Sequence, residues 1–210
     1  MLPETGQGSH GGGRGQAKAR LSREAINALP LFRYEGKVSL VHTDQELNRA
    51  LERLNSGAAL GFDTETPPSF RKGQSNNPSL IQLALEDEVF LFHFKWRPPD
   101  PELAALLGNP AVVKTGVAVH DDMRFLQAVF PFSPGAVVDL GEVARRNNVE
   151  AHGLRGLAAL FLGLRISKIE HCSDWGKRGL SIKQIRYAAT DAWISRALYF
   201  KMLEAGLDFS

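Results

Sequence analysis

Blocks of apolar residues predict an ordered series of strands and helices from about residue 21 onward. Continuous or alternating apolar runs indicate strands, whereas apolar residues spaced three and four apart indicate helices. The strands are expected at 38–42, 58–64, 80–85, 89–94, 111–115 and near Val137. The helices are expected at 22–29, 43–57, 101–107, 122–129, from about 140, at 154–162 and from 182 to about 206.

The order of these elements predicts the fold class. The polar turn at 86–88 is short enough to join two neighbouring strands as a hairpin, and the later strands alternate with helices. This order predicts an α/β domain with a mixed five-stranded sheet flanked by helices. A doubly wound parallel sheet is the alternative. It would require a helix where residues 66–79, which are rich in Pro, Gly and Asn, predict a loop.

The first 20 residues have a different composition from the rest of the chain. They contain six glycines and few apolar residues, so we expect disorder, because such a segment cannot bury enough apolar surface to offset its ordering entropy. Residues 21–210 then form one folded domain. Residues 2–6 resemble a sortase recognition signal and residues 8–10 resemble cloning sequence, so either chance or added sequence would account for part of this tail.

Charge and cysteine content narrow the functional classes. Residues 1–23 hold four basic residues against one acidic residue, and the remainder holds 21 against 22, so the folded part is not broadly basic. Any contact with nucleic acid must therefore depend on local basic residues. No apolar run approaches the ~18 residues of a membrane span, and the N-terminus does not resemble a signal peptide. With Cys172 as the single cysteine, these features predict an intracellular, cytoplasmic protein.

Two acidic residues stand at the end of a strongly apolar predicted strand. Asp63 and Glu65 are two positions apart, so their carboxylates project from the same face of the strand. Carboxylates held this close repel and raise each other's pKa unless a cation lies between them. A strand end frayed into solvent, or a cap for the following loop, is the alternative interpretation.

Two further acidic residues occur at positions where a charge needs a partner. Asp122 follows the short strand that ends near Gly116, and Asp191 shares a face of the last helix with Tyr187, four positions earlier. Taken singly, a helix cap and a buried tyrosine hydroxyl are the simpler interpretations. Together with the first pair, however, four carboxylates suit two hard divalent cations, and paired metals commonly cleave phosphodiester bonds.

In chain order these motifs resemble those of a known nuclease superfamily. Asp-x-Glu at 63–65, Asp122 at a strand-to-helix junction and Tyr-x-x-x-Asp at 187–191 resemble the three motifs of the DEDD 3′-5′ exonucleases, in the tyrosine-bearing (DEDDy) branch. The likeness covers about residues 38–205 and extends to Werner-type exonuclease domains and ribonuclease D. Its other matching segments are 61–68, 80–83, 114–117, 172–175 and 180–192.

The resemblance implies a ribonuclease H-like fold. At two positions this sequence departs from the family motifs or leaves a choice between neighbouring residues. Thr66 stands where Werner-type domains carry Trp. Asp121, directly before Asp122, leaves a choice in the second motif; the spacing from Gly116 favours Asp122, and Asp121 is the alternative.

The activity implied by the resemblance is metal-dependent hydrolysis from a 3′ end, with release of nucleoside 5′-monophosphates. Asp63 would bridge two ions, Mg²⁺ or Mn²⁺, and Glu65 and Asp191 would hold the ion that activates water. Asp122 would hold the ion at the leaving oxygen, and Tyr187 would orient the attacking water. The presence of all five motif residues argues against the alternative, a catalytically inactive nucleic-acid-binding or scaffold module.

The expected substrate is a nucleic acid with a free 3′ end, single-stranded or overhanging. Interleaved aromatic and basic residues suit single strands, because bases stack on aromatic rings and phosphates bind cations. A solvated loop with a Trp in the core is the alternative interpretation. The candidate substrate-binding residues are Thr64, Phe70, Arg71, Lys72, Trp175, Lys177 and Arg178. The sequence does not distinguish DNA from RNA.

Overall fold

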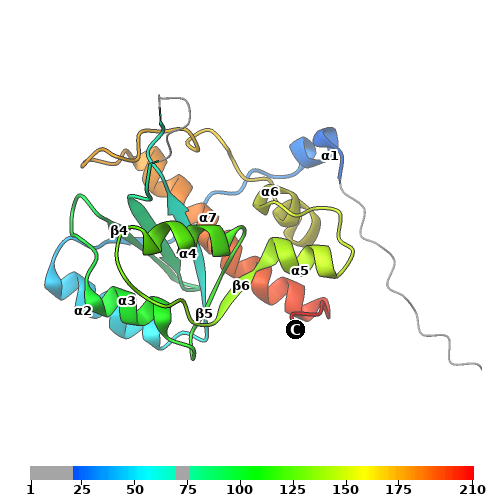
Figure 1. Cartoon of the computed structure of the whole chain (residues 1–210). Helices are drawn as coiled ribbons and strands as arrows, with labels where there is room; N and C mark the ends of the chain where they lie inside the picture. The colour runs from blue at the N-terminus through cyan, green and yellow to red at the C-terminus, as the bar shows by residue number, and fades with distance from the viewer. Residues whose placement is uncertain (1–20, 70–75) are drawn as a thin grey trace, which may run out of the picture.

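The computed structural model describes residues 21–69 and 76–210, and Figure 1 shows their arrangement. The predicted disorder of residues 1–20 and the candidates Phe70, Arg71 and Lys72 lie outside this part of the chain. The described strands form one sheet in the order β1-β4-β3-β2-β5-β6. They are β1 (Lys37–Leu40), β2 (Ala59–Glu65), β3 (Leu80–Ala84), β4 (Glu88–His93), β5 (Val113–Gly116) and β6 (Val137–Asp139).

The sheet is mixed, as the sequence pattern predicts, but the expected count of five strands is wrong. The described residues form six strands, because the short strands β1 and β6 extend the two opposite edges. β3 is antiparallel to both β2 and β4, and the remaining neighbours, β1 with β4, β2 with β5 and β5 with β6, are parallel. β2 therefore lies inside the sheet, between an antiparallel and a parallel neighbour.

Helices follow the predicted order with two local differences. They are α1 (Arg23–Ala28), α2 (Asp44–Asn55), α3 (Pro101–Gly108), α4 (Val119–Gln127), α5 (Leu140–Arg146), α6 (Leu154–Leu157), the π-helical turn η1 (Ala158–Leu162) and α7 (Ile182–Glu204). The helix predicted at 154–162 is thus divided into α6 and η1. α4 begins before Asp122, because Ala118 adopts a left-handed conformation with φ 59° and Asp139 accepts the N–H of Val119 at 2.9 Å.

Helices cover both faces of the sheet. On one face α2, α3 and α4 enclose an apolar core that includes Phe62 and Leu83 of the central strands. α7 crosses the other face, where its small residues Ala188, Ala189 and Ala192 pack in a second core. In Figure 1 α4 lies in front of the sheet and α7 behind it. None of the helices in residues 21–69 and 76–210 has the length and apolar character needed to cross a bilayer.

α7 lies so close to β2 that only glycine fits at one position of the strand. A Cβ added to Gly61 would overlap the carbonyl oxygen of Ala192 and would lie 2.8 Å from the backbone nitrogen of Arg196. Both obstacles are backbone atoms, which cannot rotate away as a side chain can. The absence of a side chain at Gly61 therefore sets the distance between β2 and α7, two residues before Asp63.

Gly61→Ala should destabilise the protein because α7 must move away from the sheet. We expect a loss of about 1–3 kcal/mol in the free energy of unfolding, the usual range for overpacking, or somewhat more. Gly179→Ala is the matched control, since a Cβ there meets nothing within 4 Å. Denaturant unfolding of both variants measures the difference, and equal stabilities would contradict the close approach of α7.

Candidate metal centre

β2 and α7 bring three acidic side chains together on one face of the sheet. Asp63 and Glu65 share a face of β2, as their spacing predicts, and Asp191 faces them from α7. One carboxylate oxygen from each of the three residues lies within 4.8 Å of the other two. Glu65 and Asp191 are only 5% and 7% exposed. Two elements separated by more than 100 residues in sequence thus place three carboxylates around one point.

Asp122 lies beside this cluster and is linked to it through β2. The hydroxyl of Thr64 donates a hydrogen bond to Asp122 Oδ1 at 2.8 Å. The negative charge of Asp122 also contributes to the raised pKa of Asp63, so the two groups are close. Asp121 is exposed and forms a salt bridge with Arg124 at 2.8 Å. This geometry favours Asp122 over Asp121 as the fourth acidic member of the site.

Burial raises the pKa values of all four carboxyl groups, and repulsion from the other acids of the cluster adds to the rise for Asp63 and Glu65. Burial, followed by repulsion from Asp63 and Asp191, raises the pKa of Glu65 to about 10. The pKa of Asp63 rises well above its usual range, first through burial and then through Asp191 and Asp122. Burial raises the pKa values of Asp122 and Asp191 to about 7. In the absence of a cation, this cluster therefore retains protons near neutral pH.

The ligand atoms of the cluster fit a hard divalent cation. Asp191 Oδ1 is buried and has no hydrogen-bond partner among the described residues. Buried polar atoms nearly always have a partner, and a cation held jointly with Asp63 and Glu65 would provide one. Carboxylate oxygens are the ligands that Mg²⁺ and Mn²⁺ prefer, whereas zinc sites usually include His or Cys.

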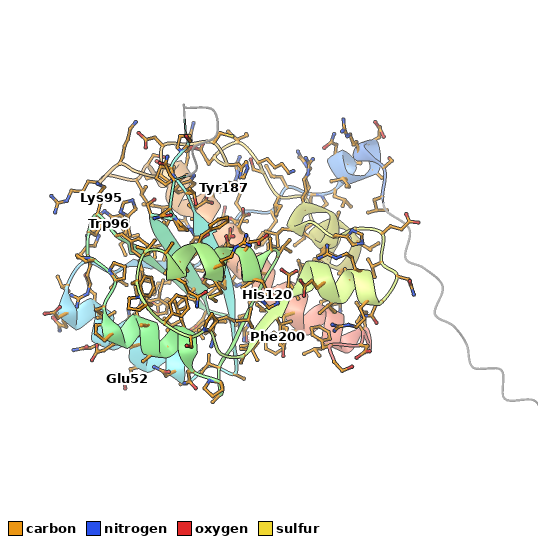
Figure 2. All side chains as sticks on the ribbon, in the orientation of Figure 1. Glu52, Lys95, Trp96, His120, Tyr187 and Phe200 are labelled. Atoms are coloured by element: carbon orange, nitrogen blue, oxygen red, sulfur yellow. The ribbon has the colours of Figure 1, made fainter. Side chains whose placement is uncertain are left out.

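Tyr187 lies one turn before Asp191 on α7, at the position labelled in Figure 2. Burial, followed by the negative charges of Asp191 and Glu65, raises the pKa of Tyr187 well above its usual value. The Tyr187 hydroxyl also forms a hydrogen bond with Asp191 that opposes the rise in the Asp191 pKa. This hydroxyl therefore stays protonated at physiological pH, so it can position a neighbouring group but cannot act as a general base.

Trp175 is a core residue, so the prediction that its ring is free to stack on a nucleic-acid base is wrong. Its side chain is fully buried, and its ring lies 6.1 Å from the ring of Tyr187. Its backbone carbonyl accepts a hydrogen bond from Ser79 Oγ at 2.7 Å and lies 2.9 Å from His93 Nε2. A base could not reach this ring without unfolding the segment. Trp175 therefore supports the position of Tyr187 from inside the protein.

The other candidate substrate residues in the described part of the chain have different surroundings. Lys177 is exposed and forms a 3.7 Å salt bridge with Asp174. Arg178 is also exposed, and its backbone carbonyl accepts a hydrogen bond from the indole of Trp96. Thr64, expected to contact substrate, directs its hydroxyl to Asp122. Roles for Thr64, Lys177 and Arg178 in substrate binding stay predictions.

Two residues near the cluster carried no clear signal in the sequence. The positive charge of Lys168 opposes the rise in the Asp191 pKa, and both residues line one cavity. Lys168 belongs to no motif and comes close to Asp191 only through the tertiary fold. Gln82 pairs with Asp63 between β3 and β2, and both of its buried amide atoms have no hydrogen-bond partner among the described residues.

A divalent cation should stabilise the protein more strongly at about pH 8 than at about pH 6. The raised pKa values of Asp122 and Asp191 mean that the metal-free cluster stabilises the fold while protonated, and that this contribution is lost as pH rises through about 7. Cations compete with these protons and therefore bind better at the higher pH. Thermal unfolding with and without MnCl₂ at both pH values measures the effect. An Asp191→Asn variant should lose most of the shift, and an undiminished shift would place the cation elsewhere.

Comparison with known proteins gives the family of the chain. The 3′-5′ exonuclease family matches residues 38–206. Mouse WRN, a bifunctional 3′-5′ exonuclease and ATP-dependent helicase, is 30% identical over 188 residues, which cover 85% of this chain and 13% of WRN. Ribonuclease D from Gluconacetobacter diazotrophicus is 32% identical over 169 residues, which cover 79% of this chain and 42% of that protein. The chain thus spans less than half the length of these two relatives.

A solved structure shows the same architecture. The exonuclease domain of Aedes aegypti Nibbler matches with a TM-score of 0.72 and 27% identity, over 86% of this chain and 95% of that domain. These likenesses confirm the predicted resemblance to Werner-type and ribonuclease D domains and the ribonuclease H-like fold. The family match contains all four carboxylates and Tyr187. The chain therefore belongs to the family of 3′-5′ exonuclease domains.

Proposed function

We propose that this protein is an active metal-dependent 3′-5′ exonuclease that releases nucleoside 5′-monophosphates from the 3′ end of a nucleic acid. The observation that carries the proposal is the convergence of Asp63, Glu65 and Asp191 within 4.8 Å, with Asp122 and Tyr187 beside them. Pairs of metals held by oxygen ligands commonly cleave phosphodiester bonds. Membership of the family supports the same conclusion.

The residues of the site divide the chemical work between them. Asp63 would bridge two divalent ions, Glu65 and Asp191 would hold the one near the attacking water, and Asp122 would hold the one near the leaving 3′ oxygen. Once bound, Mg²⁺ or Mn²⁺ lowers the pKa of bound water and balances charge on the phosphate. Tyr187 orients the attacking water through its hydroxyl, because it remains protonated beside Asp191.

The proposed substrate is a nucleic acid whose 3′ end is single-stranded or overhanging. The carboxylate cluster is largely buried, so the terminal nucleotide must separate from a complementary strand before its phosphate reaches the ions. One relative is named as a bifunctional exonuclease and helicase, and another is named as a ribonuclease. DNA and RNA are therefore both candidate substrates for this chain.

Incubation with single-stranded DNA and RNA oligonucleotides tests the proposal. In MnCl₂ or MgCl₂, a 5′-labelled strand should give a ladder of products shortened from the 3′ end, and EDTA should stop the reaction. Binding without shortening in either metal would instead identify an inactive nucleic-acid-binding module. Loss of a terminal phosphate alone would identify a phosphatase.

The two adjacent acids of the second motif should differ in their effect on cleavage. Asp122→Asn should reduce turnover strongly, because Asp122 neighbours Asp63 and accepts the hydrogen bond from Thr64. Asp121→Asn should leave turnover close to wild type, because Asp121 points to solvent and pairs with Arg124. Initial rates of both variants with Mn²⁺ make the comparison. Equal losses would mean that the two acids share the role.

A further inference from the structure

A short N-terminal segment, residues 22–36, is fixed beside the metal centre although it lies outside the region that matches the family. The N–H of Phe32 donates to the carbonyl of Arg165 at 2.8 Å. Further along, the N–H of Tyr34 donates to Thr190 Oγ1 of α7 at 3.0 Å, in a buried hydrogen bond. These contacts hold the segment in place, and Figure 1 shows α1 beside α6.

This segment forms part of the wall of a cavity of about 650 Å³ that reaches the metal centre. Tyr187 and Asp191 line the cavity from α7, and Arg23 and Asn27 line it from α1. Across the cavity, the Arg155 side chain of α6 donates a hydrogen bond to Asn27 Oδ1 at 2.7 Å. The cavity therefore runs from the carboxylate cluster to a space between α1 and α6.

The lining of this cavity carries three basic side chains and two acidic ones among uncharged residues. Arg23, Arg155 and Lys168 all contribute to it, and Glu150 is the one acidic residue that accompanies Asp191 there. Within the described residues, no salt bridge engages any of the three cations. The chain beyond residue 23 has one more acidic than basic residue, so this excess of basic over acidic side chains is local.

We propose that this cavity holds the phosphate backbone of the nucleotides that precede the 3′-terminal nucleotide, and that α1 supplies one of its walls. The inference rests on the exonuclease function proposed above. Lys and Arg side chains are the groups that most often bind nucleic-acid phosphates without regard to sequence. Because the cavity is continuous with Tyr187 and Asp191, a strand whose last phosphate lies at the metal centre would extend into it.

Charge reversal on α1 separates this cavity from the metal centre. Arg23→Glu should raise KM for a single-stranded octanucleotide about five- to tenfold at low salt, and should leave kcat nearly unchanged. A dinucleotide without a 5′ phosphate has only the phosphate at the metal centre and none to place in the cavity, so its kinetics should not change. The logarithm of the octanucleotide binding constant falls linearly with the logarithm of the salt concentration. This slope should become shallower by about 0.7 for one lost phosphate contact. Arg155→Gln should act in the same direction, because it removes a second cation of the lining.

Lys201→Glu is the matched control, since it makes the same change in net charge. Lys201 is exposed on the last turn of α7, where it pairs with Glu204 at 2.9 Å, and it does not line the cavity. Lys201→Glu should leave KM and kcat for both substrates unchanged. If wild type cleaves but Arg23→Glu behaves like Lys201→Glu, the phosphate-binding cavity is wrong while the proposed activity stands. If Arg23→Glu raised KM equally for the dinucleotide, the phosphate-binding cavity would also be wrong. If wild type cleaves neither substrate, both proposals fail.

Discussion

Asp63→Asn should reduce hydrolysis of a single-stranded oligonucleotide to background while the domain remains folded. Asp63 lies close to the other three acids of the site, since its pKa is raised by both Asp191 and Asp122 and its carboxylate lies in the cluster with Glu65. Replacing it with a neutral amide of the same size removes the ligand proposed to bridge two ions. It also removes repulsion, so the metal-free variant should unfold at an equal or higher temperature than wild type.

The control for this change is an aspartate outside the site. Asp87→Asn alters an exposed residue that pairs with Arg53 at 2.7 Å, and it should retain full activity. Initial rates with Mn²⁺ and thermal unfolding without metal are the two measurements. Near-wild-type turnover of Asp63→Asn would show that the ions, or the chemistry, lie elsewhere. A large drop in unfolding temperature would mean that Asp63 supports the fold rather than repelling its neighbours.

Tyr187→Phe should lower kcat by about 10–1,000-fold, the range expected for one positioned catalytic group, with a smaller change in KM. The substitution keeps the ring and its packing against Trp175 but removes the hydroxyl that bonds with Asp191. Because the pKa of Tyr187 is raised, wild type and variant should show the same pH profile between about pH 6 and 9. If the rate of wild type changed with pH in this range and the rate of the variant did not, the tyrosine would ionise during the reaction.

Tyr199→Phe provides the comparison on the same helix. Tyr199 makes edge contacts with Phe200 and Phe209, and it belongs to a different apolar cluster from Tyr187. Loss of its hydroxyl should leave kcat unchanged. Equal activities of wild type, Tyr187→Phe and Tyr199→Phe would assign Tyr187 a packing role and would remove it from the proposed mechanism.

Local rules explain which parts of the fold and site the sequence predicts. The two-residue spacing of Asp63 and Glu65 places both on one face of β2, and the structure brings them together with Asp191. α7 likewise begins at Ile182, as predicted, where Ser181 caps it through a reciprocal capping box with Gln184. These features depend on neighbours within a few residues, which a sequence pattern records directly.

Contacts between distant segments explain what the sequence does not reveal. α4 starts early because Asp139, 20 residues further along the chain, accepts the N–H of Val119. Trp175 is buried by elements on both sides of it in sequence, so its neighbouring basic residues wrongly indicate an exposed stacking platform. Lys168 approaches Asp191, and Arg23 reaches the same cavity, only after the chain folds.

A strand labelled at either end provides the most direct test of the central claim. The same single-stranded oligonucleotide, carrying a label on its 5′ or its 3′ nucleotide, is incubated with Mn²⁺ and wild-type protein or Asp63→Asn. We predict that wild type releases the 3′ label first, as a nucleoside 5′-monophosphate, while the 5′ label shortens one nucleotide at a time, and that Asp63→Asn and EDTA abolish both changes. Release of the 5′ label first, internal cleavage, or undiminished activity of Asp63→Asn would contradict the assignment.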